Sequence, residues 1–160
     1  MSGNLIVRSR VPGRRVDLRV LRRVVRVLMG DLLRRPGSDL AVYLVDTLEM
    51  TQLNEKFLQH QGCTDVITFD YAPTGNAGAL HGEIFVCVPE ALKQARRFHV
   101  TWPNELVRYV VHGMLHLCGY DDHRASDRAS MKKIENRLLR ELGQRFTLDQ
   151  LAAPGGQQEN

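Results

Sequence analysis

Apolar and polar residues along this chain fall into two kinds of pattern. Short apolar runs predict strands at 5–7, 40–45, 65–71 and 83–88. Apolar residues that recur every three or four positions predict helices that begin near Asp17, Asp46, Pro89, Thr101 and either Ser126 or Asp127. The resulting order, β-α-β-α-β-β-α-α-α, is not a regular alternation. It predicts an α+β fold in which helices pack on a small mixed sheet.

The apolar positions also predict which side of each helix faces the core. For the helix from Asp46, the expected inner residues are Leu48, Met50, Leu53 and Phe57. For the helix from Pro89 they include Phe98, and the last helix is expected to end at Gly143. The helix from Thr101 is apolar on almost every side, so we expect it at the centre of the fold. The strands 65–71 and 83–88 are expected to pair as a hairpin.

Length and composition add the domain organisation. With 160 residues, 43% of them apolar and 25% charged, residues 1–150 are expected to form a single domain. Residues 151–160, which contain two Gly, two Gln and one Pro, are expected to be a disordered tail. No apolar run approaches the length of a membrane span and no signal peptide is recognisable, so a cytoplasmic protein without membrane contact is expected. Three widely spaced cysteines are typical of reduced thiols that serve as packing residues.

Positive charge is concentrated at the start of the chain. The first thirty residues contain eight arginines and a single acid, Asp17, within a formal net charge of +4 for the whole chain. In the helix from Asp17, the side opposite the apolar residues carries Arg19, Arg22, Arg23 and Arg26. This pattern indicates either a surface for a polyanion such as RNA or an ordinary solvated helix face.

Candidate chemistry is concentrated in the stretch from His112 to His123. His112 and His116 are four residues apart on a predicted helix, so their imidazoles lie on one face and can converge on one ion. Gly119 can turn the chain and bring Asp122 or His123 back as a third ligand, which is the layout of a catalytic zinc site. A structural histidine pair is the alternative. Three of the six histidines fall within these twelve residues, which favours the metal site.

The same stretch carries a resemblance to a known family. His112-Gly-Met-Leu-His-Leu-Cys-Gly-Tyr-Asp-Asp-His123 resembles the signature His-Gly-x-Leu-His-Leu-x-Gly-Tyr-Asp-His of the YbeY family of bacterial zinc-dependent endoribonucleases. Leu53-Asn54 followed by 64–69, and the strand 82–86, are similar to two further segments of that family. The resemblance runs from about Asp46 to Gly143.

Two positions depart from the family pattern. The third histidine of the signature falls on Asp122, with His123 one residue later, so spacing favours Asp122 while ligand preference favours His123. In the loop after Asn54, the cationic side chain that the family is thought to use on RNA is replaced by Leu58. The first departure bears on the third ligand and the second on the mechanism of cleavage.

The resemblance implies a function. It implies an endoribonuclease specific for single-stranded RNA, with catalytic His112 and His116 and one Zn²⁺ per chain. It also implies a role in the maturation of small-subunit (16S) ribosomal RNA and in ribosome quality control, with that RNA and the small ribosomal subunit or its proteins as partners. The alternatives are a non-catalytic ribosome assembly factor with a structural zinc and a zinc metallopeptidase. Gly113 follows His112, so the glutamate of a His-Glu-x-x-His peptidase is absent.

Overall fold

The computed structural model describes residues 3–13, 15–72 and 78–152. Eight of the predicted tail residues, 153–160, therefore lie outside the described residues. In chain order the elements are β1 (Leu5–Ser9), α1 (Leu18–Val27), the π-helical η1 (Leu28–Leu32), β2 (Asp39–Val45), α2 (Thr47–Phe57), β3 (Val66–Asp70), β4 (His81–Cys87), α3 (Val88–Phe98), α4 (Trp102–Leu117), α5 (Ala125–Arg145) and the 3₁₀ helix η2 (Leu148–Leu151). This order confirms the predicted α+β fold.

The sheet has four strands in the order β1-β2-β4-β3. β1 with β2 and β2 with β4 are parallel, whereas β3 runs antiparallel to β4, from Val66 opposite Val86 to Asp70 opposite Gly82. The predicted hairpin is therefore confirmed, and the sheet is mixed. β3 is an edge strand, and α4 packs closely against it.

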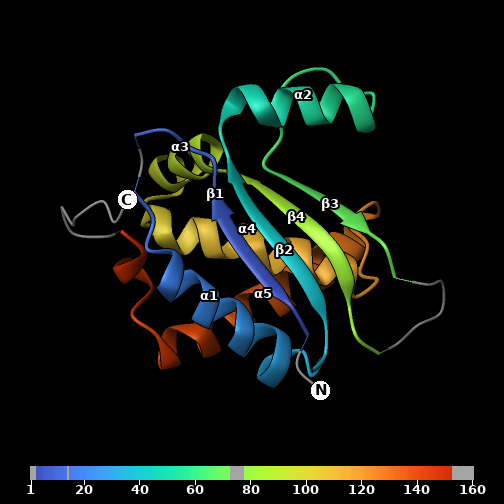
Figure 1. Cartoon of the computed structure of the whole chain (residues 1–160), viewed down its shortest axis with the longest axis vertical. Coiled ribbons are helices and arrows are strands. Elements are labelled where there is room, and N and C mark those ends of the chain that lie inside the picture. Colours follow the sequence, from blue (N-terminus) through green and yellow to red (C-terminus); the bar gives the residue numbers. More distant parts are fainter. Residues whose placement is uncertain (1–2, 14, 73–77, 153–160) are drawn as a thin grey trace.

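The two faces of the sheet are covered unequally. Alternate residues of β1, β2 and β4 point toward α1, α4 and α5 and form the main core with them, including Val7, Val42 and Ile84. On the opposite face, α2 covers a smaller cluster around Met50 and Phe85. Figure 1 shows α2 lying across the end of the sheet where β2 ends and β3 begins.

Three predictions about inner residues are wrong. Leu48 is 67% exposed and Phe57 is 53% exposed, so α2 buries Met50 but leaves much of its apolar surface in solvent. Phe98, at the end of α3, is 59% exposed. α2 lies over the end of the sheet and has few neighbours to cover it, and Phe98 is the last residue of α3.

The end of the chain also differs from the prediction. α5 does not stop at Gly143, because this glycine is not among those with positive φ, and the helix continues to Arg145. Residue 151 falls in the predicted tail, but Leu151 is fully buried and its carbonyl accepts a 2.9 Å hydrogen bond from the Asp17 amide. The described fold thus extends past residue 150, and η2 contacts the start of α1.

The basic helix has the two sides that its sequence predicts. Asp17 caps α1 by accepting from the amides of Arg19 and Val20, and Leu21, Val24 and Val25 are buried. The opposite side is exposed and carries Arg19, Arg22, Arg23 and Arg26. Within the described residues, no helix is long and apolar enough to cross a membrane.

Candidate metal centre

Helix α4 holds the two candidate histidines at the centre of the molecule. Its apolar sides are buried, including Val110, Val111, Met114 and Leu115, as the sequence predicts. The helix is followed by Gly119, which has a φ of 96°, a left-handed conformation that favours glycine. The chain therefore turns back three residues after the second histidine.

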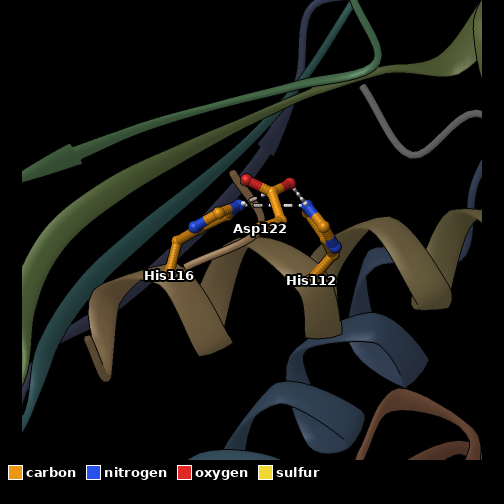
Figure 2. Close-up of side chains that lie close together, drawn as sticks. All are labelled: His112, His116 and Asp122. Atoms are coloured by element: carbon orange, nitrogen blue, oxygen red, sulfur yellow. Dashed lines mark hydrogen bonds and ion pairs between the residues drawn. The ribbon is translucent and has the colours of Figure 1, made fainter. Parts of the chain in front are cut away.

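This turn brings three side chains together. His112 Nε2 and His116 Nε2 are 3.0 Å apart, and Asp122 Oδ2 lies 3.4 Å from the first and 3.6 Å from the second. Figure 2 shows both rings pointing toward the Asp122 carboxylate from below. Ligand atoms within this range of one another can share one metal ion. Both histidine side chains are 27% exposed and that of Asp122 is 36% exposed, so solvent reaches the cluster.

The structure does not bring His123 to the two histidines. Its side chain is 87% exposed, and its Nε2 lies 3.3 Å from Asp121 Oδ1. Asp121, Asp122 and His123 also lie close enough to hold an ion, but two of these three residues are exposed on the surface. Of the two candidate third ligands, Asp122 is the one that faces His112 and His116.

Hydrogen bonds at the Nδ1 atoms of the two histidines determine the tautomer of each ring. His116 Nδ1 donates to the Tyr120 carbonyl at 3.1 Å, since a carbonyl oxygen can only accept. His112 Nδ1 is 2.7 Å from Glu135 Oε2 and donates to this carboxylate. In the neutral rings both Nε2 atoms are then acceptors. Two nitrogen lone pairs and a carboxylate oxygen converge, and a cation satisfies all three.

Sequence reasoning missed Glu135. It lies on α5, is only 7% exposed, and also forms a 3.3 Å ion pair with Arg108. A spacing of 23 residues across two helices leaves no local pattern to find, although an acidic residue on the apolar side of α5 was a weak signal. Burial by itself lowers the pKa of His112, but the hydrogen bond and charge of Glu135, together with Asp122, outweigh it and raise the pKa.

A cavity of about 450 Å³ opens beside the cluster. It is lined by His112 and Asp122 at one end and continues past Tyr109 to Glu105 on the same helix. Its size is within the range of pockets that bind small organic groups. The candidate metal centre therefore lies at the end of a larger recess.

Gly113 packs against the sheet and leaves no room for a side chain. A Cβ atom there would lie 2.8 Å from Ile84 Cγ2 and 3.2 Å from both Thr68 Cγ2 and Val66 Cγ1. The glutamate of a His-Glu-x-x-His peptidase would occupy this position. The close contact between α4 and strands β3 and β4 leaves no space for its side chain.

The loop after α2 follows Leu58, the position where the family resemblance predicts a cation. Leu58 is the C-terminal cap residue of α2 and is 42% exposed. Asn54 is buried and donates to the Gly62 carbonyl at 2.9 Å, which fixes the loop. Lys56 lies over the Phe57 ring at 5.3 Å, so a cation is present close to Leu58 in the sequence.

Fold and site together define a small α+β protein with a candidate metal centre on its central helix. The Endoribonuclease YbeY family model matches residues 14–143, and the chain belongs to this family. Two relatives with the name Endoribonuclease YbeY come from Chlorobium luteolum and Chlorobium phaeobacteroides. The first is 35% identical over 126 residues, which cover 79% of this chain and 88% of the relative. The second is 39% identical over 123 residues, which cover 76% and 86%.

A solved structure supports the same relationship. The solution structure of TM1509 from Thermotoga maritima is similar to this chain with a TM-score of 0.64 and 26% sequence identity. The similarity covers 96% of this chain and all of the other. The predicted family and fold are thus confirmed, and membership supports an endoribonuclease role.

Proposed function

We propose that this protein is a zinc-dependent endoribonuclease that cuts single-stranded RNA. The observation that carries the proposal is the convergence of His112 Nε2, His116 Nε2 and Asp122 Oδ2, with both outer ring nitrogens already engaged. These three residues would hold one Zn²⁺. When bound, the ion supplies Lewis-acid chemistry on a phosphodiester at neutral pH. The physiological setting we propose is the maturation of 16S ribosomal RNA and ribosome quality control in the cytoplasm.

The accessibility of the cluster supports a catalytic ion more than a structural one. Structural zinc sites are usually closed by four protein ligands, whereas catalytic sites keep a position for water or substrate. Within the described residues, three side chains converge here and all of them are partly exposed. Glu135 holds the His112 ring in place, so the chain positions its ligands before any ion binds.

Contacts with RNA are proposed for basic residues outside this centre. The exposed arginines of α1 offer phosphate contacts, and the small ribosomal subunit or its proteins would present the single-stranded RNA. Lys56 provides a cation in the segment where relatives carry one at the position of Leu58.

A ribosome assembly factor that binds zinc without cutting RNA is a second candidate. Leu58 favours it, because an apolar side chain cannot stabilise the charge that develops on a phosphoryl group. A peptidase is disfavoured by the closed surroundings of Gly113.

Purified protein decides between these functions. We expect wild type to contain about one zinc per chain and to cut a labelled single-stranded RNA, but not the same sequence in a duplex. His112→Ala and His116→Ala should lose both properties, whereas Cys118→Ala, outside the cluster, should keep them. In cells, depletion of the protein should leave 16S ribosomal RNA with unprocessed ends. Expression of wild type should restore normal processing, whereas expression of His112→Ala should not. If the purified protein binds zinc without cutting RNA, and wild type and His112→Ala both restore 16S processing in cells, the assembly factor is supported instead.

A further inference from the structure

Glu105 is a buried acid whose carboxylate accepts no hydrogen bond from the residues that the structure describes. The residue is only 7% exposed and lines the cavity beside the metal centre. No hydrogen-bond donor from residues 3–13, 15–72 or 78–152 contacts its carboxylate, although its backbone amide donates to Thr101. Its place in the first turn of α4 suits a negative charge, but does not require burial. Its oxygens are reachable from the cavity and can therefore accept N–H groups from a ligand.

Glu105 lies on the same face of α4 as the two histidines of the metal centre. Glu105, Tyr109, His112 and His116 are spaced by four, three and four residues, so they share one face of α4. Seven residues separate Glu105 from His112, which corresponds to roughly 10 Å along a helix. A phosphodiester held at the metal centre would therefore have a neighbouring base within reach of Glu105.

The walls of the cavity suit the flat face of a base. Phe98 is 59% exposed and Val100 is 46% exposed, and both line the same cavity as Glu105. Lys132 on α5 lies at the same cavity and offers a cation to the phosphate backbone. Aromatic stacking together with hydrogen bonds to the edge of an unstacked base is how proteins recognise single-stranded RNA.

We infer that this cavity is a subsite for one nucleobase next to the scissile phosphate, stacked on Phe98 and bonded through its N–H groups to Glu105. The inference rests on the proposed endoribonuclease function and adds a base preference to it. Guanine presents a ring N–H beside an amino group and can donate to both carboxylate oxygens. Uracil presents one N–H between two carbonyl oxygens. Both carbonyl oxygens carry negative partial charge, so the carboxylate repels them. Glu105 is thus a specificity-determining residue that favours guanine.

Cleavage of a random-sequence single-stranded RNA pool by the zinc-loaded full chain tests this subsite. Sequencing the products should show guanine enriched over uracil on one side of the cut by roughly tenfold, the discrimination of one good bidentate contact. Glu105→Gln should remove most of this enrichment, and Phe98→Ala should slow cleavage by roughly tenfold for every base. Glu141→Gln, the same change on α5 outside the cavity, is the control and should behave as wild type.

A binding measurement separates the subsite from the cleavage reaction. Guanosine 5′-monophosphate should shift the amide signals of 105–112 in an NMR titration at lower concentration than uridine 5′-monophosphate does. If the protein binds guanosine 5′-monophosphate in preference to uridine 5′-monophosphate but does not cut RNA, the nuclease proposal is overturned and the subsite is retained. Cleavage without base enrichment, or enrichment that Glu105→Gln leaves unchanged in a folded protein, overturns the subsite. Equal binding of both nucleotides without cleavage overturns both.

Discussion

Glu135 Oε2 and His112 Nδ1 are 2.7 Å apart, so a buried carboxylate on α5 orients a histidine on α4. The same carboxylate group pairs with Arg108, and Arg108 also donates to Asn136 at 3.0 Å. The candidate metal centre is therefore built from two helices rather than from the His-x-x-x-His motif alone. Carboxylates in this position fix the tautomer of a ligating histidine and increase its basicity.

We expect Glu135→Gln to weaken zinc binding by roughly 10- to 100-fold, because the amide cannot supply the negative charge that supports His112. Competition with a chromophoric zinc chelator measures the affinity. Glu141→Gln on the same helix is the matched control and should bind zinc as wild type does. Unchanged affinity in a folded Glu135→Gln protein would leave Glu135 with a purely structural role.

The third zinc ligand can be assigned by comparing two variants. Asp122→Ala should release most of the zinc, because Asp122 Oδ2 faces both histidines, whereas His123→Ala should retain about one ion per chain. Metal content after dialysis gives the answer. The opposite result would make His123 the ligand, and full metal in both variants would refute a three-ligand site.

The arginines of α1 should contribute to RNA binding by neutralising phosphates. Replacing Arg19, Arg22, Arg23 and Arg26 with Gln should flatten the dependence of log affinity on log salt by about 0.7 for each phosphate that the protein no longer neutralises. The expected effect on folding is small, because all four side chains are exposed. Arg137→Gln, an exposed arginine on α5, is the control. An unchanged slope would identify the α1 side as an ordinary solvated face.

Leu58→Arg should accelerate RNA cleavage, because it adds a cation at the position where the family resemblance leads us to expect one. A missing charge-stabilising donor can cost on the order of a hundredfold in rate, so a gain of that order is the upper expectation. Single-turnover cleavage of a short RNA measures it. Leu48→Arg adds the same charge at another exposed site of α2 and should change the rate little. Equal gains from both variants would point to non-specific attraction of RNA.

Glu105 should make folding stability depend on pH. Burial raises the pKa of this acid, and Arg108 only partly offsets the effect. Its contribution to stability is full below the unfolded pKa of about 4.3 and is lost as pH rises through the folded pKa. Glu105→Gln remains neutral, so its melting temperature should match wild type at about pH 4 and exceed it at neutral pH. A difference that is constant across this range, or larger in acid, would contradict the expectation.

The sequence predicts the strands, the hairpin and the histidine face of α4 because each depends on residues close together in the chain. Glu135 escapes such a prediction because its contact with His112 joins two helices. Glu105 had a usable signal, since its spacing places it on the face of α4 that carries the histidines. Apolar periodicity wrongly places Leu48, Phe57 and Phe98 inside because it does not report how far a neighbouring element extends. The family and the fold are confirmed, whereas zinc and its third ligand stay predictions.

The close packing of Gly113 has an evolutionary consequence. Conversion of this site to a peptidase would require a glutamate after His112, but even a methyl group at Gly113 would come within 2.8 Å of Ile84 Cγ2. That change would therefore have to be preceded by smaller residues on β3 and β4 or by a shift of α4 away from the sheet. A lineage with this helix-to-sheet spacing cannot reach peptidase chemistry by a single tolerated substitution.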